Sequence, residues 1–184
     1  NVYADVLKFF VIFCVFIFLM VTLFIDFFKY FIGEEFRAGL EVVPILLLAN
    51  LCLGIYVNLS IWYKLTDRTV MGAFVSLAGA ALTIVLNIWL IPTMGYVGSA
   101  WATLACYGAM VIVSYVLGRK YYPVAYDLKR VVGYTSLGIA LYLAHERLPL
   151  DAGRPAWLSA GGLMLVYLLS VALFEKRKIA VKPA

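Results

Sequence analysis

The stretch that decides the fold runs from Thr69 to Gly118 and reads TVMGAFVSLAGAALTIVLNIWLIPTMGYVGSAWATLACYGAMVIVSYVLG. It contains no Asp, Glu, Lys or Arg. A helix of roughly 20 residues crosses a bilayer, so this run is long enough for two crossings and must turn back once. Pro92 and Gly95 lie near its middle, and proline cannot continue a helix whereas glycine accepts a positive φ. The sequence therefore predicts two membrane helices joined by a turn at residues 91–95.

Composition supports a membrane protein throughout the chain. Of its 184 residues, 65% are hydrophobic and 14% are charged, and the mean hydropathy is +0.99. A soluble domain is about half apolar and a quarter charged. One core of this size could not bury so much apolar surface, which excludes a soluble globular fold. We predict an all-α, polytopic transmembrane helix bundle.

Four further uncharged runs supply the other candidate spans: residues 9–25, 42–63, 131–144 and 155–174. The run 131–144 is short enough for an interfacial or re-entrant segment. Lys129 and Arg130 can extend toward the headgroups, however, so a tilted or locally thinned crossing remains open. We therefore expect about six spans. No cleavable signal precedes the first of them, and we expect the chain to be the C-terminal part of a longer product.

The basic residues predict the orientation of these spans. With six crossings, most lysines and arginines fall on the side that holds both ends of the chain. By the positive-inside rule that side is cytoplasmic. The net charge of +5 then reflects membrane topology and contact with anionic lipid, and it predicts no nucleic-acid partner.

Catalytic and metal-binding patterns are missing from the sequence. His145 is the single histidine and lies at an expected helix end, where an interfacial role is favoured over a general base. Cys14, Cys52 and Cys106 each lie alone in an apolar segment and are expected to be reduced. We predict no enzyme, no catalytic residue, no cofactor and no metal site.

Polar and small side chains form stripes along three expected helices. Lipid offers no hydrogen bonds, so these stripes must face other helices or water. Close helix packing is the favoured interpretation for the small residues, whereas packing and a wet cavity remain equally open for the asparagines. The stripes consist of Asn50, Gly54 and Asn58; then Gly72, Ser76, Gly79, Ala80, Thr83 and Asn87; then Ser99, Ala102, Cys106 and Ala109.

Charged residues are expected at the ends of the spans. Lys8, Lys64 and Arg68 are interpreted as cytoplasmic interface anchors. The loop 121–130, YYPVAYDLKR, suits the headgroup region, and Asp127 is a candidate N-cap for the next helix. Its two basic residues could meet lipid phosphates or a pyrophosphate, although a simple interface anchor is favoured.

One part of the chain resembles a known family. It pairs a T-x-x-x-N-x-x-L-I-P helix end, Thr83 to Pro92, with a following G-x-x-G-S-A-x-A-T, Gly95 to Thr103. Together with the run from Pro44 to Arg130, it resembles the C-terminal half of bacterial polysaccharide (O-antigen and exopolysaccharide) flippases. These belong to the multidrug/oligosaccharidyl-lipid/polysaccharide exporter superfamily. The resemblance covers residues 8–130 well and the last two helices by position and hydropathy alone.

The resemblance implies a fold and partners. Residues 1–120 would hold four helices that complete the second lobe of a larger transporter, and 121–184 a loop, two appended helices and a basic tail. An N-terminal lobe of the same protein, membrane lipid and a lipid-linked oligosaccharide would be the partners. The location would be the bacterial inner membrane.

The implied function is to flip undecaprenyl-pyrophosphate-linked oligosaccharide to the periplasmic leaflet. Candidate substrate-binding residues are polar groups along the route and cations at its cytoplasmic mouth: Asn50, Asn58, Thr83, Asn87, Lys64 and Arg68. Alternatives are a multidrug or peptidoglycan-precursor exporter of the same superfamily, a non-transporting membrane scaffold subunit, and an integral-membrane transferase. The transferase would need catalytic groups at one interface, whereas Asp127 and His145 are expected on opposite sides.

Overall fold

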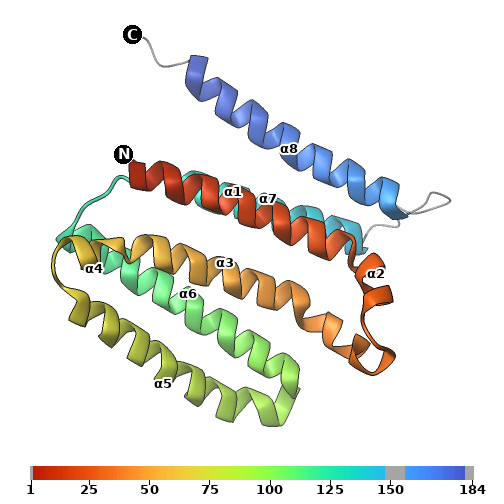
Figure 1. The fold of residues 1–184 in the computed structure, drawn as a ribbon, viewed down its shortest axis with the longest axis horizontal. Helices are drawn as coiled ribbons and strands as arrows, with labels where there is room; N and C mark the ends of the chain where they lie inside the picture. The colour runs from red at the N-terminus through yellow and green to blue at the C-terminus, as the bar shows by residue number, and fades with distance from the viewer. Residues whose placement is uncertain (1, 148–155, 181–184) are drawn as a thin grey trace. The chain divides into compact units, whose positions relative to one another are not determined.

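The computed structural model describes residues 2–147 and 156–180, and within these the chain is helical and contains no strand (Figure 1). The predicted all-α class is confirmed. The helices, in chain order, are α1 (Val2–Leu23), α2 (Ile25–Phe28), α3 (Val43–Leu59), α4 (Ile61–Leu65), α5 (Thr69–Met94), α6 (Tyr96–Tyr121), α7 (Leu128–Arg147) and α8 (Ala156–Ala180), with short 3-10 helices η1 (Lys29–Phe31) and η2 (Glu34–Val42) between α2 and α3.

Five helical stretches in the described part of the chain are long and apolar enough to cross a membrane, as a membrane-embedded protein requires. They are Val2–Leu23, Glu34–Leu65, Thr69–Met94, Tyr96–Tyr121 and Trp157–Lys176. Helix α7 has 20 residues, about 30 Å at 1.5 Å each, and so has the length to cross. It carries basic residues near both ends and is not among the five. The sixth crossing and the cytoplasmic position of both chain ends stay predictions.

The chain divides into two compact units. Unit 1 comprises Asn1–Phe9 and Ala38–Asp127, and unit 2 comprises Phe10–Arg37 and Leu128–Ala184. Residues within each unit contact one another more than they contact the other unit. Most of α1 therefore belongs to the unit that contains α7 and α8. The boundary after residue 120, which the resemblance implies, remains a separate prediction.

In unit 1, α3 and α5 both pack against α6 (Figure 1). The connection between α5 and α6 is a single residue, Gly95, whose φ of +59° and ψ of −140° suit glycine. The next turn of α6 then passes close to the end of α5, where a Cβ on Gly98 would overlap the carbonyl oxygen of Leu90. These two glycines explain the G-x-x-G spacing in the sequence, because one makes the turn and the other permits the close approach.

The expected role of Pro92 in this turn was wrong. Helix α5 continues through the proline to Met94, and the Gly95 amide donates to the carbonyl of Ile91 at 2.8 Å. A proline removes one backbone donor, but here the helix ends within three residues of it, so few further bonds are affected. Gly95 alone reverses the chain.

Unit 2 is held by contacts among α7, α8 and the part of α1 from residue 10 onward. A Cβ on Gly138 of α7 would overlap the side chain of Val15, so the missing side chain allows the two helices to approach. The Tyr167 hydroxyl of α8 donates to the carbonyl of Ile12 at 3.1 Å. Tyr167 is fully buried.

Candidate functional site

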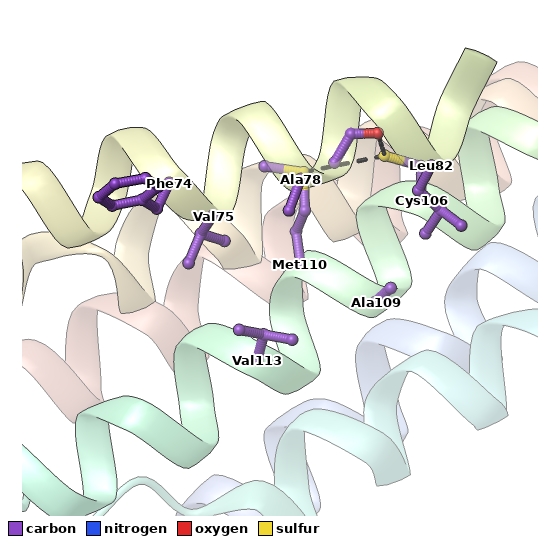
Figure 2. A pocket seen from close by; sticks show the side chains of 9 residues that line it. Phe74, Val75, Ala78, Leu82, Cys106, Ala109, Met110 and Val113 are labelled. Carbon is purple, nitrogen blue, oxygen red and sulfur yellow. Dashed lines mark hydrogen bonds between the residues drawn. The ribbon is translucent and has the colours of Figure 1, made fainter. Parts of the chain in front are cut away.

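The small residues of the α5 stripe lie against other helices of unit 1. Gly79 packs against α6, where the Cys106 thiol donates to its carbonyl oxygen at 3.1 Å (Figure 2). Ser76 forms a 3.1 Å hydrogen bond with the hydroxyl of Tyr56 on α3. A Cβ on Gly72 would lie 3.1 Å from the ring of Tyr63. The packing interpretation is therefore confirmed at these three positions.

A groove of about 260 Å³ runs between α5 and α6 on this same contact (Figure 2). Its walls are apolar side chains from both helices, so it suits hydrocarbon and not a sugar or phosphate. The groove is lined by Phe74, Val75, Ala78, Gly79, Leu82, Cys106, Ala109, Met110 and Val113.

Three of the predicted polar site residues bond to their own helices. Asn50 Nδ2 donates to the Leu46 carbonyl at 2.8 Å, and Asn58 Nδ2 donates to that of Gly54 at 2.9 Å. Thr83 Oγ1 donates to the Gly79 carbonyl at 3.0 Å. Each carboxamide keeps further bonding capacity, because it has two N–H donors and an oxygen acceptor.

The two asparagines of α3 are not enclosed. Asn50 is exposed and Asn58 is half-buried. Complete enclosure of these amides would have favoured a purely structural scaffold, and the structure of unit 1 does not show it. In the part of the chain that the structure describes, no hydrogen bond joins these amides to the polar side chains of α5.

Asn87 differs from the other three. Its Oδ1 atom is buried and accepts no hydrogen bond from any described residue. A buried acceptor without a donor costs about 1–3 kcal/mol, and almost all such groups in proteins have a partner. Asn87 is one helical turn after Thr83, so an unsatisfied acceptor adjoins a hydroxyl on α5.

The predicted cations at the end of the spans, Lys64 and Arg68, are both exposed. Arg68 lies over the ring of Tyr121, with its Cζ atom 4.3 Å from the ring centroid. Lys120 lies 5.6 Å from the centroid of the same ring, and Arg119 lies 6.0 Å from that of Tyr115. The name basic-aromatic cluster is used below for the three cations that lie over rings and for the aromatic residues around them: Arg68, Arg119, Lys120, Trp62, Tyr63, Tyr115 and Tyr121.

The aromatic part of the basic-aromatic cluster is fixed by α6. Trp62 stacks on Tyr121 with 5.6 Å between centroids and 21° between planes. Its Nε1 donates to the Ser114 carbonyl at 3.4 Å, and the Tyr63 hydroxyl donates to the Ser114 hydroxyl at the same distance. Gly118 provides the space, because a Cβ there would lie 3.1 Å from the indole ring.

Sequence reasoning named Arg68 but missed its partners. The available signal was that aromatic and basic residues lie close together at the ends of two adjacent spans, in Trp62 to Lys64 and in Tyr115 to Tyr122. That pattern is typical of a membrane interface. It could not reveal which cation lies over which ring.

Beside the basic-aromatic cluster, the chain leaves α6 and forms a hollow of about 460 Å³ lined by Val2, Tyr3, Tyr122, Pro123 and Val124. Tyr122 and Val124 also line a small cavity of about 10 Å³ that reaches Arg119. Burial, with Tyr122 and Tyr3 nearby, raises the pKa of the Tyr126 phenol, so it stays neutral at physiological pH.

The structure corrects the expected position of Lys8 at a helix end, whereas its role as an interface anchor stays a prediction. Lys8 lies well inside α1, not at its end, and is only 6% exposed. Its Nζ atom is 3.6 Å from a carboxylate oxygen of Asp5 and 4.5 Å from the centroid of the Phe9 ring. The helix begins at Val2 and continues through the charged residues, so the first uncharged residue did not mark its start.

In unit 2, Arg130 is engaged within the protein. It forms a 2.9 Å ion pair with Glu175, and the Tyr134 hydroxyl donates to the same carboxylate oxygen at 3.1 Å. Arg130 and Glu175 are 26% and 23% exposed. Arg130 thus links α7 to α8, and the lipid contact that its position suggested stays a prediction.

The candidates for catalysis and metal binding are not brought together. Cys14, Cys52 and Cys106 are free thiols. His145 Nε2 is buried and makes no hydrogen bond to a described residue. Among residues 2–147 and 156–180 no three His, Cys, Asp or Glu side chains gather in a metal-binding group. Asp127 immediately precedes α7, at the position predicted for its N-cap.

Comparison of the whole chain with protein families, with curated proteins and with solved structures gives no match.

Proposed function

We propose that this chain is part of a transporter, not an enzyme, that moves an undecaprenyl-pyrophosphate-linked oligosaccharide across the bacterial inner membrane. The observation that carries the proposal is the buried, unpartnered Oδ1 atom of Asn87 in a membrane-length helix. Hydrocarbon cannot satisfy this acceptor, whereas a sugar hydroxyl or a cavity water can. Such a site favours passage of a polar headgroup.

The supporting residues lie in the same unit. Asn50 and Asn58 present amides that are not enclosed, and each has hydrogen-bonding capacity beyond its bond to its own helix. Thr83 adjoins Asn87 on α5. In the proposed topology Lys64 and Arg68 mark the cytoplasmic mouth, where a pyrophosphate would enter. A first lobe, implied by the resemblance, would form the opposite wall and alternate with this one.

The test is lipid translocation by the gene product that contains residues 1–184, reconstituted in proteoliposomes. A fluorescent lipid-linked oligosaccharide and a membrane-impermeant reductant report which leaflet holds the headgroup. We expect N58L/N87L to slow translocation at least tenfold, because leucine offers neither donor nor acceptor. The same variant should impair polysaccharide export in cells at unchanged protein level.

The matched control is I84L/I88L, which places two leucines at exposed apolar positions of α5. It should translocate at the wild-type rate. Wild-type translocation by well-inserted N58L/N87L would refute the assignment of these amides to the route.

One observation favours a second candidate, a membrane scaffold subunit without transport. The small residues Gly72, Ser76 and Gly79 lie in helix contacts within unit 1, as a purely structural stripe would. Under this alternative the wild-type protein would not move the lipid, and N58L/N87L would change only stability or assembly.

A further inference from the structure

Three cations of the basic-aromatic cluster are held by aromatic rings and not by carboxylates. In the described part of the chain, no ion pair involves Arg68, Arg119 or Lys120. Two other basic side chains of the same structure behave differently: Lys29 pairs with Asp26 at 2.6 Å, and Arg37 pairs with Glu34 at 3.6 Å.

The arrangement concentrates positive charge. Arg68 and Lys120 both lie within 6 Å of the centroid of one ring, that of Tyr121. An anion bound beside this ring is attracted by both positive charges. Asp67, the acidic neighbour in sequence, is exposed and makes no ion pair with a described residue.

The ring contacts also leave the cations available for binding. A guanidinium that lies over an aromatic face is oriented by the ring, while its N–H groups point outward in its plane. Those groups match the oxygens of a phosphate and can bind two of them at once. Tyr121 is itself fixed, because Trp62 stacks on it and Ser114 and Gly118 seat that indole.

The position indicates what carries the phosphate. The basic-aromatic cluster lies where two candidate spans end, at Leu65 and at Tyr121. Tryptophan and tyrosine are enriched at this depth because they are partly apolar and partly polar, and it is the depth of lipid headgroups. The adjoining hollow of about 460 Å³, bordered by Tyr3 and Tyr122, has the size of a ligand pocket and can hold the rest of a headgroup.

We propose that Arg68, Arg119 and Lys120 form a binding site for the phosphate group of an anionic lipid headgroup. The site shares Arg68 with the proposed transport route but does not require transport. A lipid bound here would remain bound even if the chain is only a scaffold.

The experiment measures lipid binding to the purified protein by native mass spectrometry. The probes are phosphatidic acid and phosphatidylcholine with identical acyl chains, so that only the headgroup differs. We expect the wild-type protein to prefer phosphatidic acid. R68Q/K120Q should weaken that binding about thirtyfold, or about 2 kcal/mol. No transport is measured, so failure here is distinguishable from failure of the transport proposal.

The control variant K29Q/R37Q removes two positive charges that already have carboxylate partners. It should bind phosphatidic acid within twofold of the wild-type protein. R68K/K120R keeps both charges and should retain most of the binding. If R68Q/K120Q is unstable, two other variants test the site instead. R68K/K120R should still retain most of the binding, and R119Q should bind phosphatidic acid about fivefold more weakly than the wild-type protein.

Two results would overturn the proposal. The first is equal weakening in R68Q/K120Q and K29Q/R37Q, or no headgroup preference in the wild-type protein, because either indicates only general attraction to negative charge. The second is complete displacement of phosphatidic acid by inorganic pyrophosphate at equal concentration, which would identify a site for a soluble anion. Retention of the lipid under that competition supports a lipid site.

Discussion

Replacing Gly98 by alanine tests the α5–α6 turn directly. A Cβ at this position would overlap the carbonyl oxygen of Leu90 and lie 3.0 Å from its Cβ atom. The obstacle is mainly backbone, which cannot rotate away as a side chain can, so the two helix ends must separate. Overpacking of this kind costs about 1–3 kcal/mol.

The helix propensity of alanine opposes this loss. Alanine is favoured over glycine by about 1 kcal/mol inside a helix, so the net expected destabilisation by G98A is up to about 2 kcal/mol. Gly108 on the same helix provides the control, because nothing lies within 4 Å of the position of its Cβ. G108A should therefore be neutral or stabilise by up to about 1 kcal/mol.

The assay is unfolding of the purified protein in mixed micelles as the mole fraction of dodecyl sulfate rises, followed by circular dichroism. The two variants should move the midpoint in opposite directions. If G98A is as stable as G108A, the close approach of α6 to the end of α5 is not present in the membrane protein, and this account of the G-x-x-G spacing is wrong.

Three further substitutions test other contacts by the same unfolding measurement. G138A should destabilise unit 2 by up to about 2 kcal/mol after the same gain in helix propensity, and adding V15A should recover part of that loss because the overlapping side chain is shortened; purely additive effects would contradict a direct contact. G95A should cost about 1–3 kcal/mol, since an L side chain is strained at a φ of +59°, and an unchanged midpoint would mean that the turn adopts another conformation. E175Q should cost about 1–3 kcal/mol by weakening a half-buried ion pair, whereas D26N, at an exposed pair, should change stability by less than about 1 kcal/mol; equal effects would refute the difference in burial.

Much of the fold could be predicted because membrane helices are dictated by composition. A long uncharged run in lipid must satisfy its own backbone hydrogen bonds, which an α-helix does. The runs that flank Gly95 accordingly form α5 and α6. The error at Pro92 arose because a proline near the end of a helix disrupts few hydrogen bonds. The error at Lys8 arose because charge marked the expected end of the span, whereas a lysine with a nearby carboxylate and ring can lie inside the helix.

The candidate site was less predictable because it depends on contacts between distant residues. The spacing of Asn50, Asn58, Thr83 and Asn87 places each pair on one face of its helix, but it does not show which acceptor lacks a donor. The ion pair of Arg130 with Glu175 joins residues far apart in the chain, and no local pattern indicates it. Likewise, Tyr121 could not be paired with Arg68 before the turn between α4 and α5 was known.

The hydrogen bonds within single helices have a consequence for how the chain enters the membrane. Helices insert individually before they assemble, and a polar side chain without a partner is costly during that step. Asn50, Asn58 and Thr83 donate to carbonyls of their own helices, so each carries its partner into the bilayer. No hydrogen bond joins the side chain of Asn87 to a described residue, so its amide depends on what it meets after insertion. Insertion of α5 is therefore expected to be more sensitive to residue 87 than to residue 83, as glycosylation-based insertion assays of the isolated segment can measure.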